Sequence, residues 1–424
     1  MKKALTILLL AASFFSCKKT YEVLQPDYAT WALFKNPAAI RINTSARNAM
    51  EGVYNLKTGT DVFGELVAVK WSYAIRGGDT SFHVSGFFGK DVAWFICEGK
   101  RLGDSILLNG YWRKMVNVET GIMRFVINQA NGANKILSAN PIIDSGSITM
   151  DGVFGAGQDE PKVAISFTYD RKLNKSPAPF EILAHRGGGR TSDLLQVSEN
   201  SVNIILKTPE FGSTGIEIDV RFTKDGVPIL YHDNDLNLRV VQKSGLVGPI
   251  ENYTYDQLTA FVRLVNGEKI PTLREALNAV LYQTGLTFVW LDTKYIGSLA
   301  PVQAIQKEFL QKAAAAGRNL KIVIGLPGKD QYFSFLELPD YLNTPSLCEL
   351  SIEEAATTNS IWAPRFTEGL QADKVAQVQA QGRRVFSWTV DVPDFVTQFV
   401  QKGNFDGVLS NFPSSVAFNY YTNE

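Results

Sequence analysis

The sequence predicts two successive domains, an all-β antiparallel barrel or sandwich followed by an α/β domain built as a (β/α)8 barrel. Up to residue 175, short alternating apolar runs are separated by Gly, Asn and Asp, without helical periodicity between them. From Pro177 onward, strand-like runs alternate with helix-like runs. Polar residues lie in or directly after these later strand-like runs, where (β/α)8 barrels carry their functional groups.

The start of the chain has the form of an export signal. Lys2 and Lys3 precede an apolar run from Ala4 to Phe15, which is too short to cross a bilayer as a helix. Cys17 follows a small residue at the end of this run, an arrangement that resembles the lipobox of bacterial lipoproteins. We therefore predict a signal peptide over residues 1–16 and a lipid anchor at Cys17, at the outer membrane or periplasmic face of a bacterial envelope. The alternative is a plain secreted protein that is cut nearby.

Charge and cysteine content exclude several classes of protein. The 424 residues include 42 basic and 42 acidic side chains, so the balance gives no reason to expect a nucleic-acid partner. Besides Cys17, the chain contains Cys97 and Cys348, which fall in different predicted domains. A disulfide framework and a cysteine-based metal site are therefore not expected. Nothing in the sequence indicates an oligomeric state.

The first domain is predicted to be β-rich over residues 43–175, after a tether and entry segment over 17–42. Its strand-like runs favour a lipocalin-like barrel of about eight strands, with a sandwich as the alternative. The runs cover residues 66–73, 80–88, 105–113 and 162–169. His83 stands alone in one run and is expected to be a surface or structural residue, not a ligand. Tyr111 and Trp112 either line a binding cavity or belong to the core, which is the usual place of aromatic residues in strands.

The second domain, over residues 176–424, contains eight strand-like runs in about 240 residues, the size and number of a (β/α)8 barrel. The predicted strands are Phe180 to His185, Gly215 to Thr223, Pro228 to His232, Thr287 to Lys294, Leu320 to Leu326, Ser346 to Ser351, Arg384 to Val390 and Phe405 to Leu409. The predicted helices are Ser201 to Lys207, Thr272 to Tyr282, Pro301 to Ala316, Asp373 to Gln381 and Pro393 to Gln401. The turn between the second and third strands is too short for a helix, so the alternation is imperfect there.

The candidate site lies at the ends of these strands. Period-2 alternation places the carboxylates of Glu217 and Asp219 on one face of the second strand. His185 and His232, two of only three histidines, end the first and third predicted strands. Asp292 in the fourth strand is a candidate third carboxylate. Two imidazoles and a set of carboxylates are the components of a metal-assisted acid/base site.

The motifs in this domain resemble those of the glycerophosphodiester phosphodiesterase family. The resemblance covers residues 180–415 and none of the first domain. It is carried in order by His185-Arg-Gly, Glu199-Asn-Ser, Glu217-Ile-Asp, Thr223-Lys-Asp-Gly-Val-Pro, His232-Asp, Ile270-Pro-Thr-Leu-Arg-Glu-Ala-Leu, Leu291-Asp-Thr-Lys, Ser387-Trp-Thr-Val and Phe405-Asp-Gly-Val-Leu-Ser-Asn-Phe-Pro. Ordered motifs over a whole domain are a specific signal.

The resemblance implies a triosephosphate-isomerase-type barrel that hydrolyses glycerol phosphodiesters to glycerol 3-phosphate and an alcohol with Ca²⁺ or Mg²⁺. Oxygen ligands suit such hard cations, so the three carboxylates are the expected metal ligands. By the same resemblance, the two histidines act as acid and base, and the order of their roles stays open. Arg186 and Lys294 are expected to contact phosphoryl oxygens. Trp388 is expected to form a wall of the glycerol pocket, with barrel core as the alternative.

Two positions depart from the family pattern. Asp292 stands where the family usually has glutamate, and Asn411 stands where it usually has aspartate. Shorter metal reach and a weaker supporting contact are the expected consequences. Two other functions remain open on the sequence: a binding lipoprotein that holds a phosphodiester or lipid headgroup without turnover, and a lyase-like relative that forms a cyclic phosphate.

Two further features have two interpretations each. The glycines at 187–189 form either a turn or a close approach for phosphate, and Glu199 and Asn200 either cap a helix or support the site.

Overall fold

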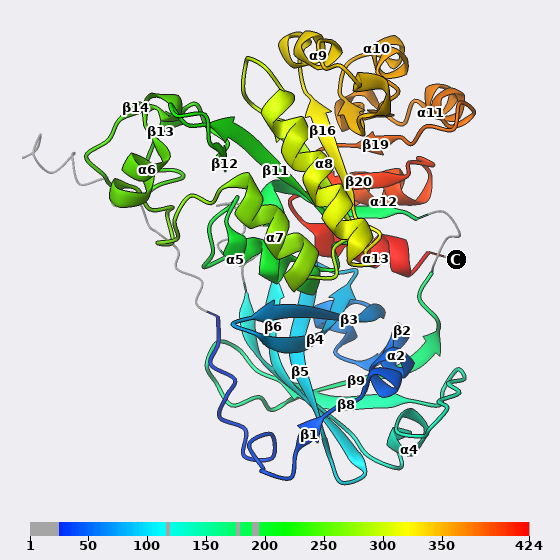
Figure 1. Cartoon of the computed structure of the whole chain (residues 1–424). Helices are drawn as coiled ribbons and strands as arrows, with labels where there is room; N and C mark the ends of the chain where they lie inside the picture. The colour runs from blue at the N-terminus through cyan, green and yellow to red at the C-terminus, as the bar shows by residue number, and fades with distance from the viewer. Residues whose placement is uncertain (1–24, 116–118, 175–178, 189–194, 424) are drawn as a thin grey trace, which may run out of the picture.

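The structure is a computed structural model that describes residues 25–115, 119–174, 179–188 and 195–423. The predicted signal peptide and Cys17 lie outside these residues. Within them, every helix is too short or too polar to cross a bilayer. Figure 1 shows two units, with the strands β2 to β9 in the lower half and the strands β11, β16 and β20 in the upper half.

The first unit is a closed antiparallel barrel of eight strands. Each strand pairs with the next along the chain, and the last pairs with the first, so the sheet has no free edge among these eight. The strands are β2 (Gly52–Thr58), β3 (Leu66–Arg76), β4 (Asp79–Phe88), β5 (Ala93–Leu102), β6 (Ser105–Lys114), β7 (Thr120–Ile127), β8 (Thr149–Phe154) and β9 (Val163–Arg171). The barrel interpretation is thus confirmed over the sandwich. The short β1 (Ile40–Arg41) pairs with β5, and the helices are α2 (Thr44–Met50), α3 (Thr60–Phe63) and α4 (Ala133–Ile136).

Aromatic side chains fill the interior of this barrel. Phe125 packs edge-on against Phe167 with ring centroids 5.0 Å apart, and Phe63 stacks on Phe88 at 4.6 Å. Trp112 is buried in the same core and donates its indole N–H to a backbone carbonyl oxygen. Tyr111, on the opposite face of the same strand, is buried outside the barrel. Both aromatic residues therefore belong to packed cores.

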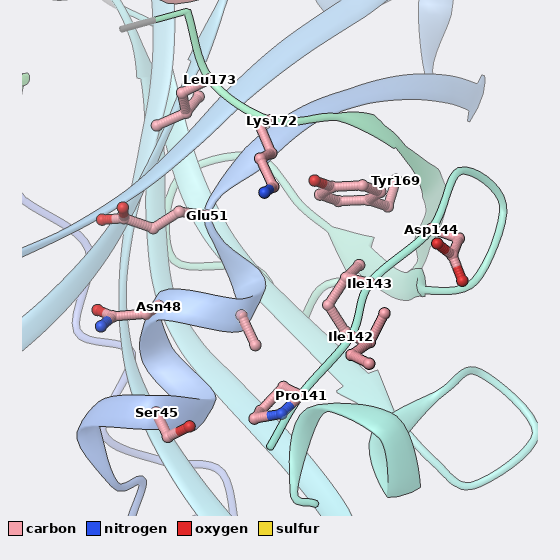
Figure 2. A pocket seen from close by; sticks show the side chains of 11 residues that line it. Ser45, Asn48, Glu51, Pro141, Ile142, Ile143, Asp144, Tyr169, Lys172 and Leu173 are labelled. Atoms are coloured by element: carbon pink, nitrogen blue, oxygen red, sulfur yellow. The ribbon is translucent and has the colours of Figure 1, made fainter.

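A pocket of about 880 Å³ lies between α2, residues 141–144 and the end of β9 (Figure 2). One side is apolar, with Ile142 and Ile143, and the other side carries polar groups of α2 and Glu51. The eight site residues predicted from the sequence are all absent from its lining.

The second unit is a parallel barrel of eight strands. In spatial order these are β18 (Ile361–Trp362), β17 (Ser346–Cys348), β16 (Lys321–Leu326), β15 (Phe288–Thr293), β11 (Gly215–Phe222), β10 (Glu181–Ala184), β20 (Gly407–Ser410) and β19 (Phe386–Ser387). Two isolated bridges, Trp362 to Val385 and Arg365 to Trp388, join the last strand to the first. The predicted fold class is confirmed.

One of the eight predicted strands is present but lies outside the parallel barrel, and one barrel strand was not predicted. Residues 228–230 form β12, which pairs antiparallel with β11 outside the barrel. A connection of five residues, 223–227, can form only a hairpin, because parallel pairing needs a longer crossover. His232 consequently follows a hairpin strand, not a barrel strand. The place of the missing barrel strand is taken by β18, whose two residues are too few for a periodic pattern.

The five predicted helices are present as α5 (Val202–Lys207), α7 (Leu273–Gln283), α8 (Ala300–Ala315), α11 (Ala372–Gln379) and α12 (Pro393–Gln401). Their starts follow from local chemistry: Thr272 and Glu275 form a reciprocal capping box at the start of α7. The other α-helices described in this unit are α6 (Tyr255–Phe261), α9 (Lys329–Leu336), α10 (Ile352–Thr357) and α13 (Pro413–Tyr421). The 3₁₀ turns are η1 (His185–Gly188), η3 (Thr208–Phe211), η4 (Ile250–Asn252), η5 (Tyr341–Asn343) and η6 (Phe366–Glu368). The strands β13 (Asp235–Leu236) and β14 (Gly248–Pro249) form a small antiparallel ribbon.

The two barrels share one apolar core. The outward faces of β3 and β4 pack against η3 and α13, and Trp94 meets Phe211 edge-on at 5.5 Å. The Tyr73 hydroxyl donates to the carbonyl oxygen of Thr284 at 3.1 Å. Phe211 and Thr284 precede the strands β11 and β15, so this contact covers the N-terminal end of the parallel barrel. The C-terminal ends of the parallel strands lie at the opposite end of this barrel.

Candidate active site

The eight predicted site residues lie in or after strands β10, β11, β12, β15 and β19. His185 and Arg186 begin η1 directly after β10, Asp292 is near the end of β15, and Lys294 directly follows this strand. His232 follows the hairpin strand β12, whose partner is the C-terminal half of β11. The strand register places Asp219 beside Asp292. Short contacts or mutual charge effects link seven of the eight, and Trp388 is the exception.

Three buried carboxylates form the centre of the site. One carboxylate oxygen each from Glu217, Asp219 and Asp292 lies within 4.8 Å of the others. Glu217 Oε1, Asp219 Oδ1 and Asp292 Oδ1 are buried without a hydrogen-bond partner among the described residues. Buried carboxylate oxygens are normally satisfied, and converging unsatisfied ones are the donor set of a hard divalent cation. The residues present therefore fit a Ca²⁺ or Mg²⁺ ion.

The mutual repulsion of these carboxylates is visible in their proton affinities. Burial, with the charges of Asp219 and Asp292, raises the pKa of Glu217 well above its ordinary value. Burial also raises the pKa of Asp292. Burial alone would raise the pKa of Asp219, but Lys294, His232 and Arg186 lower it below its ordinary value. A cation bound between the three carboxylates would relieve the remaining repulsion.

Lys294 places a positively charged side chain beside the carboxylate cluster. Its ammonium group forms an ion pair with Asp292 and lies 3.5 Å from Asp219 Oδ1. Burial opposes its charge, yet the surrounding carboxylates raise the pKa of Lys294. Lys294 therefore stays protonated at the edge of the carboxylate cluster, within reach of a bound anion.

His185 has a neutral partner. Its Nδ1 lies 2.7 Å from Asn411 Oδ1, and its Nε2 lies 3.8 Å from Glu217 Oε2. Burial, followed by the charge of Arg186, lowers the pKa of His185 to about 4. The ring is therefore uncharged near neutral pH.

His232 has a charged partner. Its Nδ1 lies 2.7 Å from Asp233 Oδ1. Burial alone would raise the pKa of Asp233, but hydrogen bonds from Arg239, His232 and Asn237 lower it below its ordinary range. Arg239 in turn forms two hydrogen bonds of 3.0 Å with Glu199. A fixed carboxylate thus orients the His232 ring.

Glu199 and Asn200 support the site and do not cap the helix. The N-cap of α5 is Ser201, whose hydroxyl accepts from the backbone N–H of Ile204. Glu199 accepts hydrogen bonds from the Arg186 guanidinium at 3.1 Å. Asn200 has a φ of 56° and donates its amide N–H to Asp219 Oδ2 at 2.7 Å. Both side chains therefore hold groups of the site in place.

A backbone hydrogen bond and a left-handed conformation hold Arg186 at the site. The backbone N–H of Arg186 donates to Glu217 Oε2 at 2.7 Å, and its φ is 53°. Gly187 and Gly188 follow with φ of 79° and 110°, so this part of the glycine run forms a tight left-handed turn, while Gly189 lies outside the described residues. The Arg186 Nε–H is buried without a hydrogen-bond partner among the described residues. That free donor lies 4.0 Å from Asp219 Oδ2.

Trp388 lies on the same rim but apart from the carboxylates. Its indole N–H donates to the carbonyl oxygen of Ala363 at 2.8 Å, and the Arg365 guanidinium lies 4.7 Å from its ring centroid. The side chain is partly exposed. These contacts leave its role as a pocket wall an untested prediction.

Three residues near the site were not predicted from the sequence. Arg239 holds Asp233, and Asp391 holds Asn411 through two hydrogen bonds. Glu349 follows β17, and burial together with Asp292 raises its pKa. Arg239 lies outside the predicted strands, so only the tertiary structure could have located it. Glu349 lies within the predicted strand Ser346 to Ser351, and Asp391 directly follows the predicted strand Arg384 to Val390, so the position of polar residues at strand ends could have found these two. The third histidine, His83, is outside the site, buried at the contact between the barrels with Nδ1 3.4 Å from Glu210.

Comparison with known proteins gives the class. Residues 185–415, more than half of the chain, match the glycerophosphoryl diester phosphodiesterase family. The chain belongs to this family, as its motifs suggested.

The individual relatives are partial or distant matches. The chain is 37% identical to human glycerophosphodiester phosphodiesterase 1 over 137 residues. The matched region covers 30% of this chain and 38% of the human protein. It is 22% identical to a glycerophosphodiester phosphodiesterase of Caldanaerobacter subterraneus over 55% of this chain and 95% of that protein. Among solved structures, the chain is similar to an Oleispira antarctica phosphodiesterase in complex with the product sn-glycerol-3-phosphate. The two chains are 19% identical with a TM-score of 0.42, and the match covers 55% of this chain and 94% of the other.

Proposed function

We propose that this protein hydrolyses glycerophosphodiesters to glycerol 3-phosphate and an alcohol, with a divalent cation and two histidines. The observation that carries the proposal is the cluster of three buried carboxylates with unsatisfied oxygens beside His185 and His232. Membership of the phosphodiesterase family supports the reaction type.

Glu217, Asp219 and Asp292 would hold the cation, Ca²⁺ or Mg²⁺. When bound, such an ion neutralises the negative charge that repels nucleophiles from a phosphodiester. Asn200 and the backbone of Arg186 hold two of these carboxylates through the oxygens that do not face the cluster. The protein therefore supplies a preorganised set of oxygen ligands.

The surroundings of the two histidines support opposite roles. His185 is kept uncharged by burial and Arg186, so its Nε2 can accept the proton of an attacking hydroxyl group. His232 is held through its Nδ1 by Asp233, a carboxylate that Arg239 fixes in place. We assign it the donation of a proton to the departing alkoxide, which leaves as the alcohol. The attacking group is water or the glycerol hydroxyl of the substrate.

Arg186 and Lys294 are the proposed phosphoryl contacts. The unpaired N–H of Arg186 and the ammonium group of Lys294 both lie within 4.0 Å of Asp219. A phosphoryl oxygen at this place would satisfy the buried N–H, which otherwise costs free energy. Trp388 is proposed to bound the glycerol side of the pocket.

The proposal includes attachment to a bacterial envelope through a lipid at Cys17. The basic Lys2 and Lys3, the apolar run after them and the small residue before Cys17 support it. Mass spectrometry of the protein from a membrane fraction tests this part. A lipid-modified N-terminal cysteine is expected, and an unmodified protein in the medium would contradict it.

An assay with glycerophosphocholine and glycerophosphoethanolamine tests the activity. Each substrate is incubated with Ca²⁺, with Mg²⁺ or with chelator, and the products are followed by phosphorus NMR. Glycerol 3-phosphate is expected with one or both metals and not with chelator. A cyclic phosphate as the final product would instead identify a lyase. Substrate binding without any product under all three conditions would show that the protein is a binding protein.

A further inference from the structure

A chain of hydrogen bonds runs from the His185 ring to Asp391, a carboxylate that the proposed reaction does not use. His185 Nδ1 lies 2.7 Å from Asn411 Oδ1, and Asn411 Nδ2 lies 2.5 Å from Asp391 Oδ2. The other Asp391 oxygen accepts from the backbone N–H of Asn411 at 2.8 Å and from Ser410 Oγ at 3.2 Å. Both carboxylate oxygens of Asp391 are thus held by fixed donors.

Three neighbouring strands bring these residues together. In the barrel, β20 lies between β10 and β19. His185 follows β10, Asn411 follows β20, and Asp391 follows β19 after a continued backbone pairing of Val390 with Leu409. Asn411 is buried at 3% exposure, so no solvent competes for its amide group. The line of residues is therefore fixed by the strand order of the barrel.

The direction of the hydrogen bonds follows from the carboxylate. An ionised carboxylate only accepts hydrogen bonds, so Asn411 must turn its NH₂ group toward Asp391. Its carbonyl oxygen then faces His185, and a carbonyl oxygen only accepts. The hydrogen of a neutral His185 ring must therefore be on Nδ1. Its Nε2, 3.8 Å from Glu217, keeps a free lone pair directed into the site.

We propose that Asp391 is a positioning residue that acts through Asn411 to fix His185 in the Nδ1–H tautomer, with Nε2 open to accept a proton. Without Asp391, the amide of Asn411 can present either its oxygen or its NH₂ group to the ring. The effect on turnover rests on the proposed function, whereas the tautomer does not. Although residue 411 is an asparagine, His185 still has the support of a carboxylate, because Asp391 contacts the ring indirectly through Asn411.

Asp391→Asn gives a sharp test, because it changes only one oxygen to NH₂. The new amide at position 391 would keep its oxygen on the backbone N–H of residue 411 and point its NH₂ group at the side chain of Asn411. Asn411 would then turn its own oxygen toward that NH₂ group and its own NH₂ group toward His185. The ring would have to accept at Nδ1, so the hydrogen would move to Nε2. The single substitution is therefore expected to reverse the tautomer.

The double variant Asp391→Asn with Asn411→Asp provides the rescue. A carboxylate at 411 accepts from both the NH₂ group at 391 and Nδ1–H of His185, so the original tautomer should return. The exposed Asp394, in the first turn of α12, is a matched control when changed to Asn.

The tautomer is read from ¹⁵N chemical shifts of histidine-labelled, metal-free protein at pH 7.5, with the His185 signals assigned by their loss in His185→Gln. His83 and His232 serve as internal references. Nδ1–H is expected for the parent protein, the control and the double variant, and Nε2–H for Asp391→Asn. Nδ1–H in folded Asp391→Asn would overturn the proposal, as would Nε2–H in the parent protein.

Kinetics provide the second readout. Asp391→Asn is expected to lower kcat about 10- to 100-fold with little change in KM, the usual size of effect for a partner of a catalytic group. The double variant should recover most of that loss. A lowered kcat that the double variant does not recover, with the tautomer restored, would separate turnover from the tautomer and overturn the positioning role. If the parent protein hydrolyses no glycerophosphodiester, the proposed function fails, while the NMR result still decides the tautomer.

Discussion

At the scale of single residues, the two histidines differ in what lies behind each ring. His185 faces a neutral amide and a buried environment, whereas His232 faces an ionised carboxylate that Arg239 holds in place. Burial and Arg186 keep the His185 ring neutral, and a carboxylate orients the His232 ring. These surroundings underlie the proposed base and acid.

We expect His185→Ala and His232→Ala each to abolish turnover while the protein stays folded. Both side chains are partly exposed at the rim, so neither is needed to fill the core. Hydrolysis of glycerophosphocholine and a circular dichroism melting curve are the measurements. His83→Ala is the control, because His83 lies at the contact between the barrels. Unchanged hydrolysis in either site variant would remove that histidine from the mechanism.

Asp233→Asn is expected to lower the free energy of unfolding at pH 7 by about 1–3 kcal/mol, the range for charge-assisted hydrogen bonds. The pKa of Asp233 is lowered in the folded protein, so its ionised form contributes stability above the ordinary carboxyl pKa of about 4. That contribution is lost as the pH falls through the lowered folded value. Urea unfolding of both proteins from pH 7 to pH 3 should therefore show a difference that shrinks below about pH 4.

The exposed Asp235, two residues further along the chain, is the control for this measurement. Asp235→Asn should leave stability nearly unchanged over the same pH range. A difference between Asp233→Asn and the parent protein that grows toward low pH would contradict the role of the ionised carboxylate.

At the scale of elements, the turn η1 positions both His185 and Arg186. Three successive residues, Arg186, Gly187 and Gly188, have φ between 53° and 110°, which reverses the chain directly after β10. Thr208 at the end of α5 fastens the turn, since its hydroxyl donates to the carbonyl oxygen of Gly187. The close contact with α5 leaves no room for a side chain on Gly188.

Gly188→Ala is expected to destabilise the protein and to lower activity. A Cβ atom at this position would lie 1.9 Å from Thr208 Oγ1, and the φ of 110° is itself unfavourable for alanine. Gly226→Ala is the matched control, since Gly226 has a φ of 77° with open space around its Cβ position. The control should lose only the cost of backbone strain, about 1–2 kcal/mol. Thermal melting should place Gly188→Ala clearly below Gly226→Ala, and equal melting temperatures would contradict the steric argument.

At the scale of the whole molecule, the two barrels form one packed body. The outer face of the antiparallel barrel contributes Phe87, Trp94 and Tyr111 to the same apolar core as the parallel barrel. This explains why aromatic residues lie on both faces of its strands. The contact covers the N-terminal end of the parallel barrel, and the candidate site lies at the C-terminal ends of the parallel strands.

We expect calorimetry of the parent protein to show one unfolding transition, because the shared core couples the two barrels. Trp94→Ala should remove about 3–5 kcal/mol and separate two transitions, since Trp94 packs against Phe211 at the contact. Phe125→Ala, inside the antiparallel barrel, is the control that should destabilise without separating them. Two well-separated transitions in the parent protein would show that the barrels unfold independently.

The sequence by itself determined the two β-containing units and the family, and it supplied the candidate residues of the site. Alternation and strand-end polar residues are local properties, so His185, Glu217, Asp219 and Asp292 could be identified from the chain alone. It predicted eight barrel strands, the number observed, but not the correct set: it counted the hairpin strand β12 and omitted β18, whose two residues carry no period.

Only the tertiary structure decided what surrounds each group. Whether Glu199 and Asn200 cap a helix or hold Arg186 and Asp219 depends on contacts across the barrel, not on neighbours in the sequence. The same holds for Asp391, which reaches His185 through Asn411 because β19, β20 and β10 lie side by side. Proton affinity and orientation arise from burial and from residues far apart in the chain, and only the closed barrel brings those residues together.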